Sequence, residues 1–387
     1  MKLLLLNSVI GYGSTGRLCV DIAKAYERDG HEVKIAFGRN DKVPDDCRKY
    51  AVRIGSSTDV YLHIAGTRFT DRHGLFSVNA TREFLEWADR YDPDVLWMHN
   101  VHGYYVNYEL LFEWIKSRPQ MSVKWTLHDC WAFTGHCAYF SYVGCDRWLI
   151  NEDLRFGDVK KGGCGNCPQR GAYPRSLFKD ASADNYQRKK AAFTGIPKMS
   201  LITPSVWLKN QVRQSFLSEY PVQVVYNRID TSVFKQTQSE FRAEHGIRRT
   251  DFVMLGVANV WEPRKGLVDL IELHKRLAED KTITQGFHLV IVGLNDKQLK
   301  SLPSGIIGMK RTANANELAE IYSAADVVLN PTYEDNYPSV ILEAEACGTP
   351  VITYDTGGCA EAIHISGSKA IPRGIDSLEK EVLHRLT

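Results

Sequence analysis

No run of apolar residues in this sequence approaches the length of a membrane-spanning helix, so we expect no such helix. The first ten residues, MKLLLLNSVI, also lack the features of a secretion signal. They hold one lysine, a short apolar run and a glycine-rich turn where a cleavage site would lie. They predict a buried first strand. We therefore expect a cytoplasmic protein. Disulfides are rare in that compartment, so the nine cysteines do not by themselves indicate disulfide bonds.

The sequence carries almost no excess charge of either sign. The formal net charge is +2 over 387 residues, of which 24% are charged and 44% hydrophobic. This composition is typical of a soluble globular protein, and it gives no overall reason to expect nucleic acid as a partner. The chain is long enough for two domains of ordinary size.

Two common signatures of cofactor binding are missing. A glycine-rich turn, Gly11 to Gly16, follows the first strand, and at Gly13 it would let backbone N–H groups approach an anion. Its spacing departs from the dinucleotide fingerprint, and no acidic residue closes the second strand at 33–37, so a NAD(P) enzyme is disfavoured. No Asp-x-Asp pair stands at a suitable strand end, which favours charge stabilisation by side chains, with no cofactor required for catalysis.

Apolar strands alternate with amphipathic helices, which predicts an α/β fold with doubly wound parallel sheets. Strands are predicted at 95–98, 123–127, 201–203, 222–226, 252–258, 288–292, 327–329 and 350–354. Helices are predicted at 82–90, 109–116, 185–193, 206–216, 314–323 and 377–386. In such sheets ligands bind at the carboxyl ends of the strands.

Polar residues gather where two strands of the first half end. His99, Asn100 and His102 follow one strand, and His128 with Asp129 follows the next. A single histidine is more often structural than catalytic, but a His-Asp pair at a strand end favours His128 as a functional residue.

The most informative stretch runs from Val327 to Gly358. A buried strand ends in a polar loop, and a helix then follows Pro338 and ends at Gly348. Asp335 precedes this helix, and Glu343 lies about five residues inside it, roughly 7–8 Å along the axis. The positive amino end of the helix attracts a phosphate, so the two carboxylates could hold hydroxyls at both ends of a diphosphate. The alternative is that Asp335 caps the helix and Glu343 is a surface acid.

A second anion-binding pattern follows the strand at 252–258. Arg264 and Lys265 stand side by side before Gly266, and a helix starts near Leu267. Two adjacent cations at a helix amino end can clamp a diphosphate. The alternative is a plain surface turn, because Arg-Lys before Gly is common on protein surfaces.

The stretch 335–352 resembles the donor-binding motif of family-4 glycosyltransferases, E-x7-E followed by A-x-A-x-G-x-P-V-I. Here Asp335-x7-Glu343 is followed by AEACGTPVI. The resemblance implies that Glu343 holds the ribose hydroxyls of a nucleotide. It also implies that Asp335, which replaces the family's glutamate, lies near the donor sugar and diphosphate. Glu334 is one residue out of register and could substitute for it.

The resemblance covers nearly the whole chain. Lys265 matches a family lysine that grips the diphosphate, whereas the family's arginine falls on Asn259, so Arg264 would supply the second charge. His128 matches a histidine near the reacting carbon of the donor sugar. The family's GT-B fold implies two Rossmann-like domains facing a central cleft. They are an acceptor-side domain at 1–228 with a Cys-rich insertion at 130–170, and a nucleotide-sugar-binding domain at 229–387.

The resemblance thus implies a hexosyltransferase-type enzyme of bacterial cell-surface polysaccharide assembly, of the colanic acid, capsule or lipopolysaccharide type. It would move a sugar, with retention of configuration, from a nucleotide diphosphate sugar to a saccharide or lipid-linked acceptor. The implied catalytic residues are His128, Asp335 and Glu343. The implied donor contacts are Gly13, Arg264, Lys265, Asn336, Tyr337 and Glu343. The acceptor side would hold His99, Asn100, His102 and Tyr105.

Five of the nine cysteines fall in the insertion at 130–170. A C-x2-C pair, Cys164 and Cys167, combined with Cys137 and Cys145, predicts a structural zinc site of four thiolates. His136 or Cys130 could replace one of these ligands. Reduced thiols packed in a loop and a disulfide are the alternatives.

Two basic runs, Lys160-Lys161 and Arg188 to Lys190, suggest a contact with anionic lipid at the inner face of the membrane. A solvated charged face is the alternative. Two rival functions also remain: an inactive GT-B-like scaffold of a polysaccharide-assembly complex, and a zinc-stabilised nucleic-acid-binding protein. The near-neutral net charge argues against the second.

Overall fold

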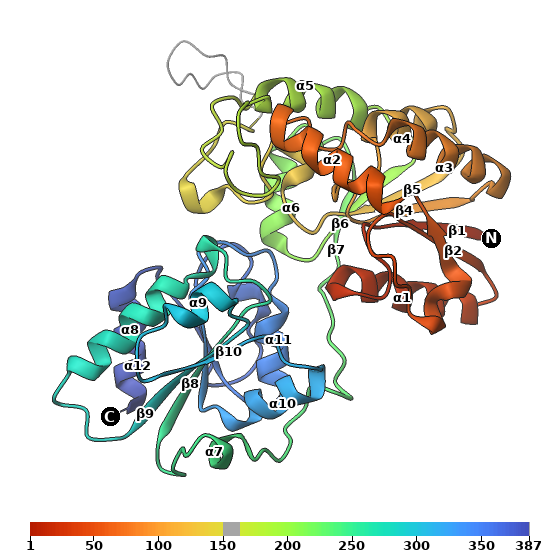
Figure 1. Ribbon diagram of the computed structural model, residues 1–387. Helices are drawn as coiled ribbons and strands as arrows, with labels where there is room; N and C mark the ends of the chain where they lie inside the picture. The colour runs from red at the N-terminus through yellow and green to blue at the C-terminus, as the bar shows by residue number, and fades with distance from the viewer. Residues whose placement is uncertain (150–162, 387) are drawn as a thin grey trace. The chain divides into compact units, whose positions relative to one another are not determined.

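The chain folds into two compact units, which are Met1–Val225 and Tyr226–Thr387. The computed structural model in Figure 1 describes residues 1–149 and 163–386. The division falls directly after the last strand of the first unit, and the sequence places it at residue 228. Each unit has its own sheet and its own core.

The N-terminal unit is built on a parallel seven-stranded sheet. The strand order is β3 (Ala51–Arg53), β2 (Glu32–Phe37), β1 (Lys2–Leu6), β4 (Val95–Met98), β5 (Ser122–Thr126), β6 (Met199–Thr203) and β7 (Val222–Val224). Its interior strand β1 is apolar after Lys2 because helices cover both faces, and Leu3 to Leu6 are fully buried.

Helices cover both faces of this sheet, as Figure 1 shows. One face packs on α1 (Gly13–Arg28) through Cys19, Val20 and Ala23. The other face holds the larger core, which contains many aromatic side chains. The helices on that side are α2 (Ser57–Thr70), α3 (Val78–Tyr91), α4 (Tyr108–Lys116), α5 (Ser182–Phe193) and α6 (Val206–Arg213). Short 3-10 turns lie at Asp45–Tyr50, Trp131–Phe133 and Ser141–Val143.

The C-terminal unit has a parallel six-stranded sheet. Its strand order is β10 (Ile306–Met309), β9 (Phe287–Val292), β8 (Phe252–Val257), β11 (Val327–Asn330), β12 (Val351–Tyr354) and β13 (Lys369–Ile371). The helices are α7 (Phe241–Glu244), α8 (Leu267–Glu279), α9 (Asp296–Lys300), α10 (Ala315–Ala324), α11 (Ser339–Ala346) and α12 (Ile375–Leu386). One face packs on α8 and α12, and the other on α10 and α11. Two 3-10 turns, Pro263–Lys265 and Ala360–Ala362, lie in the loops.

Each sheet contains a topological switch point. In the N-terminal unit the chain runs outward from β1 through β2 to β3 and then returns to β4 on the other side of β1. In the C-terminal unit it runs from β8 through β9 to β10 and returns to β11 on the other side of β8. The loops that leave the two strands at a switch point diverge to opposite faces, which opens a crevice where ligands of such sheets bind. The pairs β1/β4 and β8/β11 are therefore where a site is expected.

The predicted fold class is confirmed, since both units are doubly wound parallel α/β sheets. Every strand and helix predicted from the sequence is present, with ends shifted by a few residues. The helices α2, α7 and α9 and the short strands β3, β10 and β13 were not predicted from the sequence. No helix within residues 1–149 and 163–386 is both long and apolar enough to cross a membrane.

Candidate active site

Two loops at the C-terminal switch point are bonded to each other. The N–H of Tyr333, in the loop after β11, donates to the carbonyl of Arg264, in the loop after β8, at 2.7 Å. The Arg264 guanidinium donates back to the carbonyl of Glu334 at 2.9 Å. Gly266 has a left-handed φ of +75°, and a Cβ there would lie 2.0 Å from the carbonyl oxygen of Pro331. Only glycine therefore permits this close approach of the loops.

A carboxylate and two cations meet between these loops. The Lys265 ammonium forms an ion pair with the buried carboxylate of Asp335, and an Arg264 nitrogen lies 3.6 Å from the same oxygen. The Asn336 N–H donates to the other oxygen at 2.9 Å. Burial alone would raise the pKa of Asp335, but Lys265 and Arg264 hold it below its ordinary value. These three side chains together carry one net positive charge, and Arg264 also pairs with the half-exposed Glu262 at 3.2 Å.

The amino end of α11 opens just beyond this cluster. Its N-cap residue is Pro338, and no side chain caps the helix there. The first N–H groups and the positive end of the helix dipole are therefore available to an anion. The sequence left open whether Asp335 caps this helix; the structure pairs it with Lys265.

Glu343 is the fifth residue of α11 and is half-buried. The hydroxyl of Tyr322, from α10, donates to its Oε2 at 3.0 Å. Burial raises the pKa of Tyr322 well above 10, so this hydroxyl keeps its proton and orients the carboxylate. Tyr322 has no counterpart in the sequence motif, and its contribution emerges only from the packing of α10 on α11.

The loop residues next to Asp335, which the resemblance implies are donor contacts, are buried. Asn336 and Tyr337 are 3% and 5% exposed, and the Tyr337 ring lies 5.0 Å from that of Tyr226. The N–H of Gly358 donates to the carbonyl of Asp335 at 2.9 Å. A Cβ on Gly357 would lie 1.9 Å from that same carbonyl oxygen. The glycine pair after β12 thus holds the Asp335 backbone in place.

At the N-terminal switch point a fully buried asparagine ends β1. The side-chain oxygen of Asn7 accepts the N–H of Asn100 at 3.3 Å, which ties the loops after β1 and β4 together. The Asn100 amide reaches the Thr15 hydroxyl at 3.4 Å. Gly13 opens α1 with a φ of +62°, and no heavy atom lies within 4 Å of the position of a Cβ. Asn7 and Thr15 were missed from the sequence; a polar residue closing an otherwise apolar strand was the available signal.

Two stacked imidazoles lie beside this loop. His99 Nδ1 and His128 Nε2 are 3.1 Å apart, and the rings lie 5.4 Å apart at an interplanar angle of 18°. Burial lowers the pKa of His128 to about 4 and that of His99 well below its ordinary value. Both rings are therefore neutral at pH 7. A neutral imidazole can contact a centre of developing positive charge without repelling it.

A third histidine bridges two further groups. His102 places Nε2 at 3.1 Å from a carboxylate oxygen of Asp129 and Nδ1 at 2.9 Å from the Tyr173 hydroxyl. Burial would raise the pKa of Asp129, but His102 and the Trp131 N–H together lower it. The sequence associated Asp129 with His128; its hydrogen-bonded histidine is His102. Tyr105 is 1% exposed, and its hydroxyl donates to the Asn100 carbonyl, so it holds the loop after β4 from the protein interior.

The four cysteines of the predicted zinc site all lie against the larger core of the N-terminal unit. All nine cysteines of the chain are unpaired, so the disulfide alternative is wrong. Cys137 and Cys167 share a hydrogen bond, which raises the pKa of the Cys137 thiol and lowers that of Cys167 to about 7. Within residues 1–149 and 163–386, no group of three or more His, Cys, Asp or Glu side chains is arranged to hold a metal ion. Zinc binding stays a prediction.

The basic run at 188–190 is only partly exposed. Lys189 is 1% exposed, and its ammonium donates to the carbonyls of Trp131 and Thr134 at 2.7 and 2.9 Å. Arg188 is held by Asp184 and Glu109, each at 2.9 Å. Of the three cations only Lys190 is exposed, because α5 turns Lys189 into the core. The contact with anionic lipid that the sequence suggests for this run stays a prediction. The other basic run, at 160–161, lies outside the described residues.

Comparison with known proteins places these features in context. Residues 251–387 match the family described as glycosyl transferases group 1. WcaC of Escherichia coli, which is named as a colanic acid biosynthesis glycosyl transferase, is 23% identical to this chain over 308 residues. The aligned region covers 75% of this chain and 65% of WcaC. A processive diacylglycerol alpha-glucosyltransferase of Acholeplasma laidlawii is 28% identical over 160 residues, which is 40% of this chain and 48% of that protein.

Solved structures share the fold over the whole chain at low identity. Sucrose-phosphate synthase from Thermosynechococcus elongatus has a TM-score of 0.67 at 15% identity, covering 100% of this chain and 89% of its own. Anabaena HepE, solved in complex with UDP-glucose, has a TM-score of 0.59 at 16% identity, covering 99% and 89%. The two Rossmann-like units thus match the GT-B fold that the sequence predicts.

Proposed function

We propose that this chain is a retaining glycosyltransferase. It transfers a sugar from a nucleoside-diphosphate sugar to a saccharide or lipid-linked saccharide in the assembly of a cell-surface polysaccharide. The observation that carries the proposal is the cation pair of Arg264 and Lys265 on Asp335, at the uncapped amino end of α11. The match of residues 251–387 to group 1 glycosyltransferases and the colanic acid assignment of WcaC support it.

The donor diphosphate would bind between the loops after β8 and β11. There the cations and the first N–H groups of α11 meet its negative charge. Glu343, oriented by the Tyr322 hydroxyl, would accept hydrogen bonds from the ribose diol. The family arginine that would assist falls on the exposed Asn259, and Arg264 supplies that charge from the same loop. HepE, which adopts the same fold, was solved with UDP-glucose.

In the reaction, the bond between the anomeric carbon and the diphosphate oxygen breaks, and an acceptor hydroxyl oxygen forms the new bond on the same face. The acceptor proton leaves with the departing diphosphate. Lys265, Arg264 and the end of α11 stabilise the negative charge that develops there. His128 is neutral and hydrogen-bonded to His99, so it can contact the sugar hydroxyls as the anomeric carbon becomes positive. The catalytic roles fall to His128, Asp335 and Glu343.

A nucleotide screen tests the proposal. Thermal shifts are measured for the full chain with UDP, GDP, CDP and dTDP, and turnover is then assayed with donors of the preferred base. We expect one nucleotide to raise the melting temperature, because a ligand that binds only the folded state stabilises it. The absence of a shift with all four would count against the proposal. Nucleotide binding without turnover on any acceptor would identify the inactive scaffold as the correct function.

We propose separately that Cys137, Cys145, Cys164 and Cys167 hold a structural zinc ion. The four thiols lie against the same core, and Cys137 and Cys167 share a hydrogen bond, although the described residues do not show a metal-holding arrangement. His136 is a possible replacement ligand, since Asp71 fixes its Nδ1 and its buried Nε2 has no partner among the described residues. Metal analysis should find about one zinc per chain. Metal-free, fully folded protein would reject the site.

A further inference from the structure

The solvent-facing side of α2 is apolar. Tyr61, Leu62 and Phe69 are 71%, 65% and 58% exposed, and Ala65 between them is exposed as well. At about 100° per residue these four positions fall within an arc of roughly 100° on one side of the helix. The residues buried beneath α2, which include Val60 and two polar side chains, lie on the other side. The helix thus turns much of its apolar surface toward solvent.

A nearby loop extends this surface. The Phe178 ring is 64% exposed and stacks on Phe69, with ring centres 5.4 Å apart and planes 9° apart. The N–H of Leu177 donates to the carbonyl of Arg68 at 2.8 Å, which fixes the loop to the end of α2. We call Tyr61, Leu62, Ala65, Phe69, Leu177 and Phe178 the α2 apolar face. Isolated exposed apolar side chains are ordinary, but a contiguous aromatic set marks an interaction surface.

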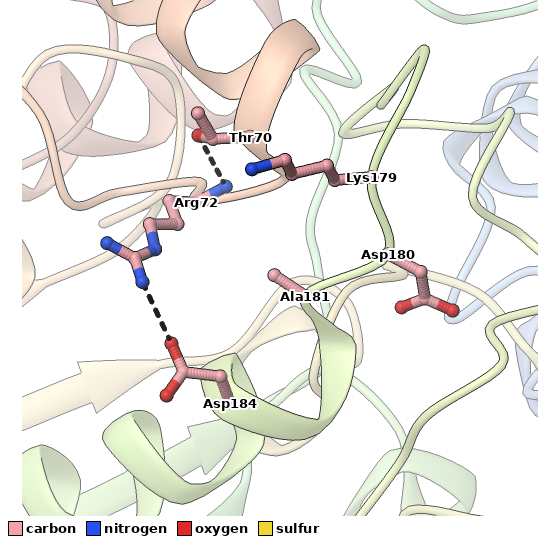
Figure 2. A pocket seen from close by; sticks show the side chains of 6 residues that line it. All are labelled: Thr70, Arg72, Lys179, Asp180, Ala181 and Asp184. Carbon is pink, nitrogen blue, oxygen red and sulfur yellow. Dashed lines mark hydrogen bonds and ion pairs between the residues drawn. The ribbon is translucent and has the colours of Figure 1, made fainter.

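Cations lie at the end of the α2 apolar face that holds Phe69 and Phe178. Arg68, Arg175 and Lys179 are exposed, and Arg170 holds the loop through the Phe178 carbonyl at 3.2 Å. Arg72 lines a pocket of about 530 Å³ together with Lys179, as Figure 2 shows.

Most nearby acids are already engaged. Asp71 is fully buried against His136. Asp184 pairs with Arg72 at 3.7 Å and with Arg188, and Asp180 accepts the N–H groups of Cys167 and Ser182. The exposed charge around the apolar face is therefore predominantly positive, which matches an anionic partner.

We propose that the α2 apolar face docks the N-terminal unit on an anionic lipid bilayer. The aromatic and aliphatic side chains would enter the boundary between headgroups and acyl chains, while the adjacent arginines and lysines contact lipid phosphates. The charge complementarity favours a lipid surface over an apolar protein groove, since each cation near an anionic membrane adds to binding. This surface is distinct from the basic run at 188–190, and it does not depend on the enzymatic activity of the chain.

Vesicle co-sedimentation of the full chain tests the proposal. Phosphatidylcholine vesicles are compared with vesicles that also contain phosphatidylglycerol. One variant combines Tyr61→Ser, Leu62→Ser, Phe69→Ser and Phe178→Ser, and a second combines Arg68→Gln, Arg175→Gln and Lys179→Gln. The matched control carries Val260→Ser and Val268→Ser, two apolar residues of the C-terminal unit that are 56% and 64% exposed. Melting temperatures show that each variant is folded.

We expect the wild type and the control to bind the anionic vesicles, and each of the two variants to bind at least about tenfold more weakly. Equal binding by the apolar variant and the wild type would overturn the proposal, as would no binding by the wild type. Light scattering of the same proteins without vesicles detects the main alternative. A wild-type dimer that the apolar variant converts to a monomer would assign this face to a second copy of the chain and also overturn the proposal.

Discussion

Lys265 lies at the point where the two loops of the proposed donor site meet. Its ammonium neutralises Asp335 in this structure, and a bound diphosphate would add a second negative partner. We expect Lys265→Ala to lower kcat/KM by at least about tenfold, because the developing charge on the leaving group loses a cation. Lys265→Arg is the matched control and should keep more activity. Near-normal turnover of the alanine variant would contradict the role.

Glu343 and its hydrogen-bonded tyrosine give a graded test of nucleotide binding. Glu343→Ala should cut turnover by about tenfold or more and weaken binding of the preferred nucleotide, since the ribose diol loses its acceptor. Tyr322→Phe removes only the hydroxyl that donates to Oε2 at 3.0 Å, so its effect should be smaller and should fall on nucleotide affinity. Calorimetric titration measures the nucleotide affinity of each variant. Unchanged affinity in both variants would exclude ribose recognition at this carboxylate.

The neutral imidazoles of His99 and His128 predict a loss of stability in acid. Burial lowers both pKa values in the folded state, to about 4 for His128, whereas an unfolded histidine titrates near 6.5. The unfolded state therefore binds more protons between these values, and stability falls as the pH drops from about 6.5 toward 4. His128→Gln should reduce the slope of melting temperature against pH in this window. His384→Gln, at an exposed residue, is the control, and equal slopes for all three proteins would refute the argument.

At the scale of elements, the loops around Gly266 set the geometry of the donor site. Gly266→Ala places a methyl group 2.0 Å from the Pro331 oxygen at a left-handed φ, so the two loops must separate. Gly246→Ala has a similar φ of +66° with no atom within 4 Å, and it isolates the backbone cost, which is about 1 kcal/mol. Chemical denaturation and nucleotide titration should show that only Gly266→Ala loses both stability and nucleotide affinity. Equal effects would mean that the loop contact is unimportant.

The elements that the sequence predicted and those that it missed differ in a physical way. Central strands such as β11 are buried on both faces, so they are continuous apolar runs that are easy to recognise. The short edge strands β3 and β13 each include a charged residue, and β10 contains Gly308 and is only half-buried. α2 was missed because Tyr61, Leu62 and Phe69 face solvent while His63 and Thr67 are buried, which removes the helical period.

Local motifs in the sequence predicted residues of the candidate site, but not which of them pair across the fold. The sequence supplied Lys265, Asp335 and Glu343 from their spacing within single loops and one helix. It could not show that Lys265 pairs with Asp335, because the two residues are 70 positions apart and meet only through the order of β8 and β11. The partnership of Asp129 with His102, and the role of Asn7, likewise depend on strand order.

At the scale of the whole molecule, the chain has two independent cores and two switch points with different chemistry. The C-terminal switch point concentrates positive charge beside a helix end, whereas the N-terminal one concentrates neutral imidazole and amide groups. The charge at the C-terminal switch point fits a donor held by its phosphates in that unit. The central claim is that the nucleotide binds at the β8/β11 switch point.

Hydrogen exchange of the full chain, followed by mass spectrometry with and without the preferred nucleoside diphosphate, tests this claim most directly. We expect slowed exchange in residues 259–268 and 333–343, where the cation pair and the amino end of α11 would contact the diphosphate. Protection at these segments should disappear in Lys265→Ala at the same nucleotide concentration. Protection confined to other parts of the chain, with these two segments unchanged, would contradict the account.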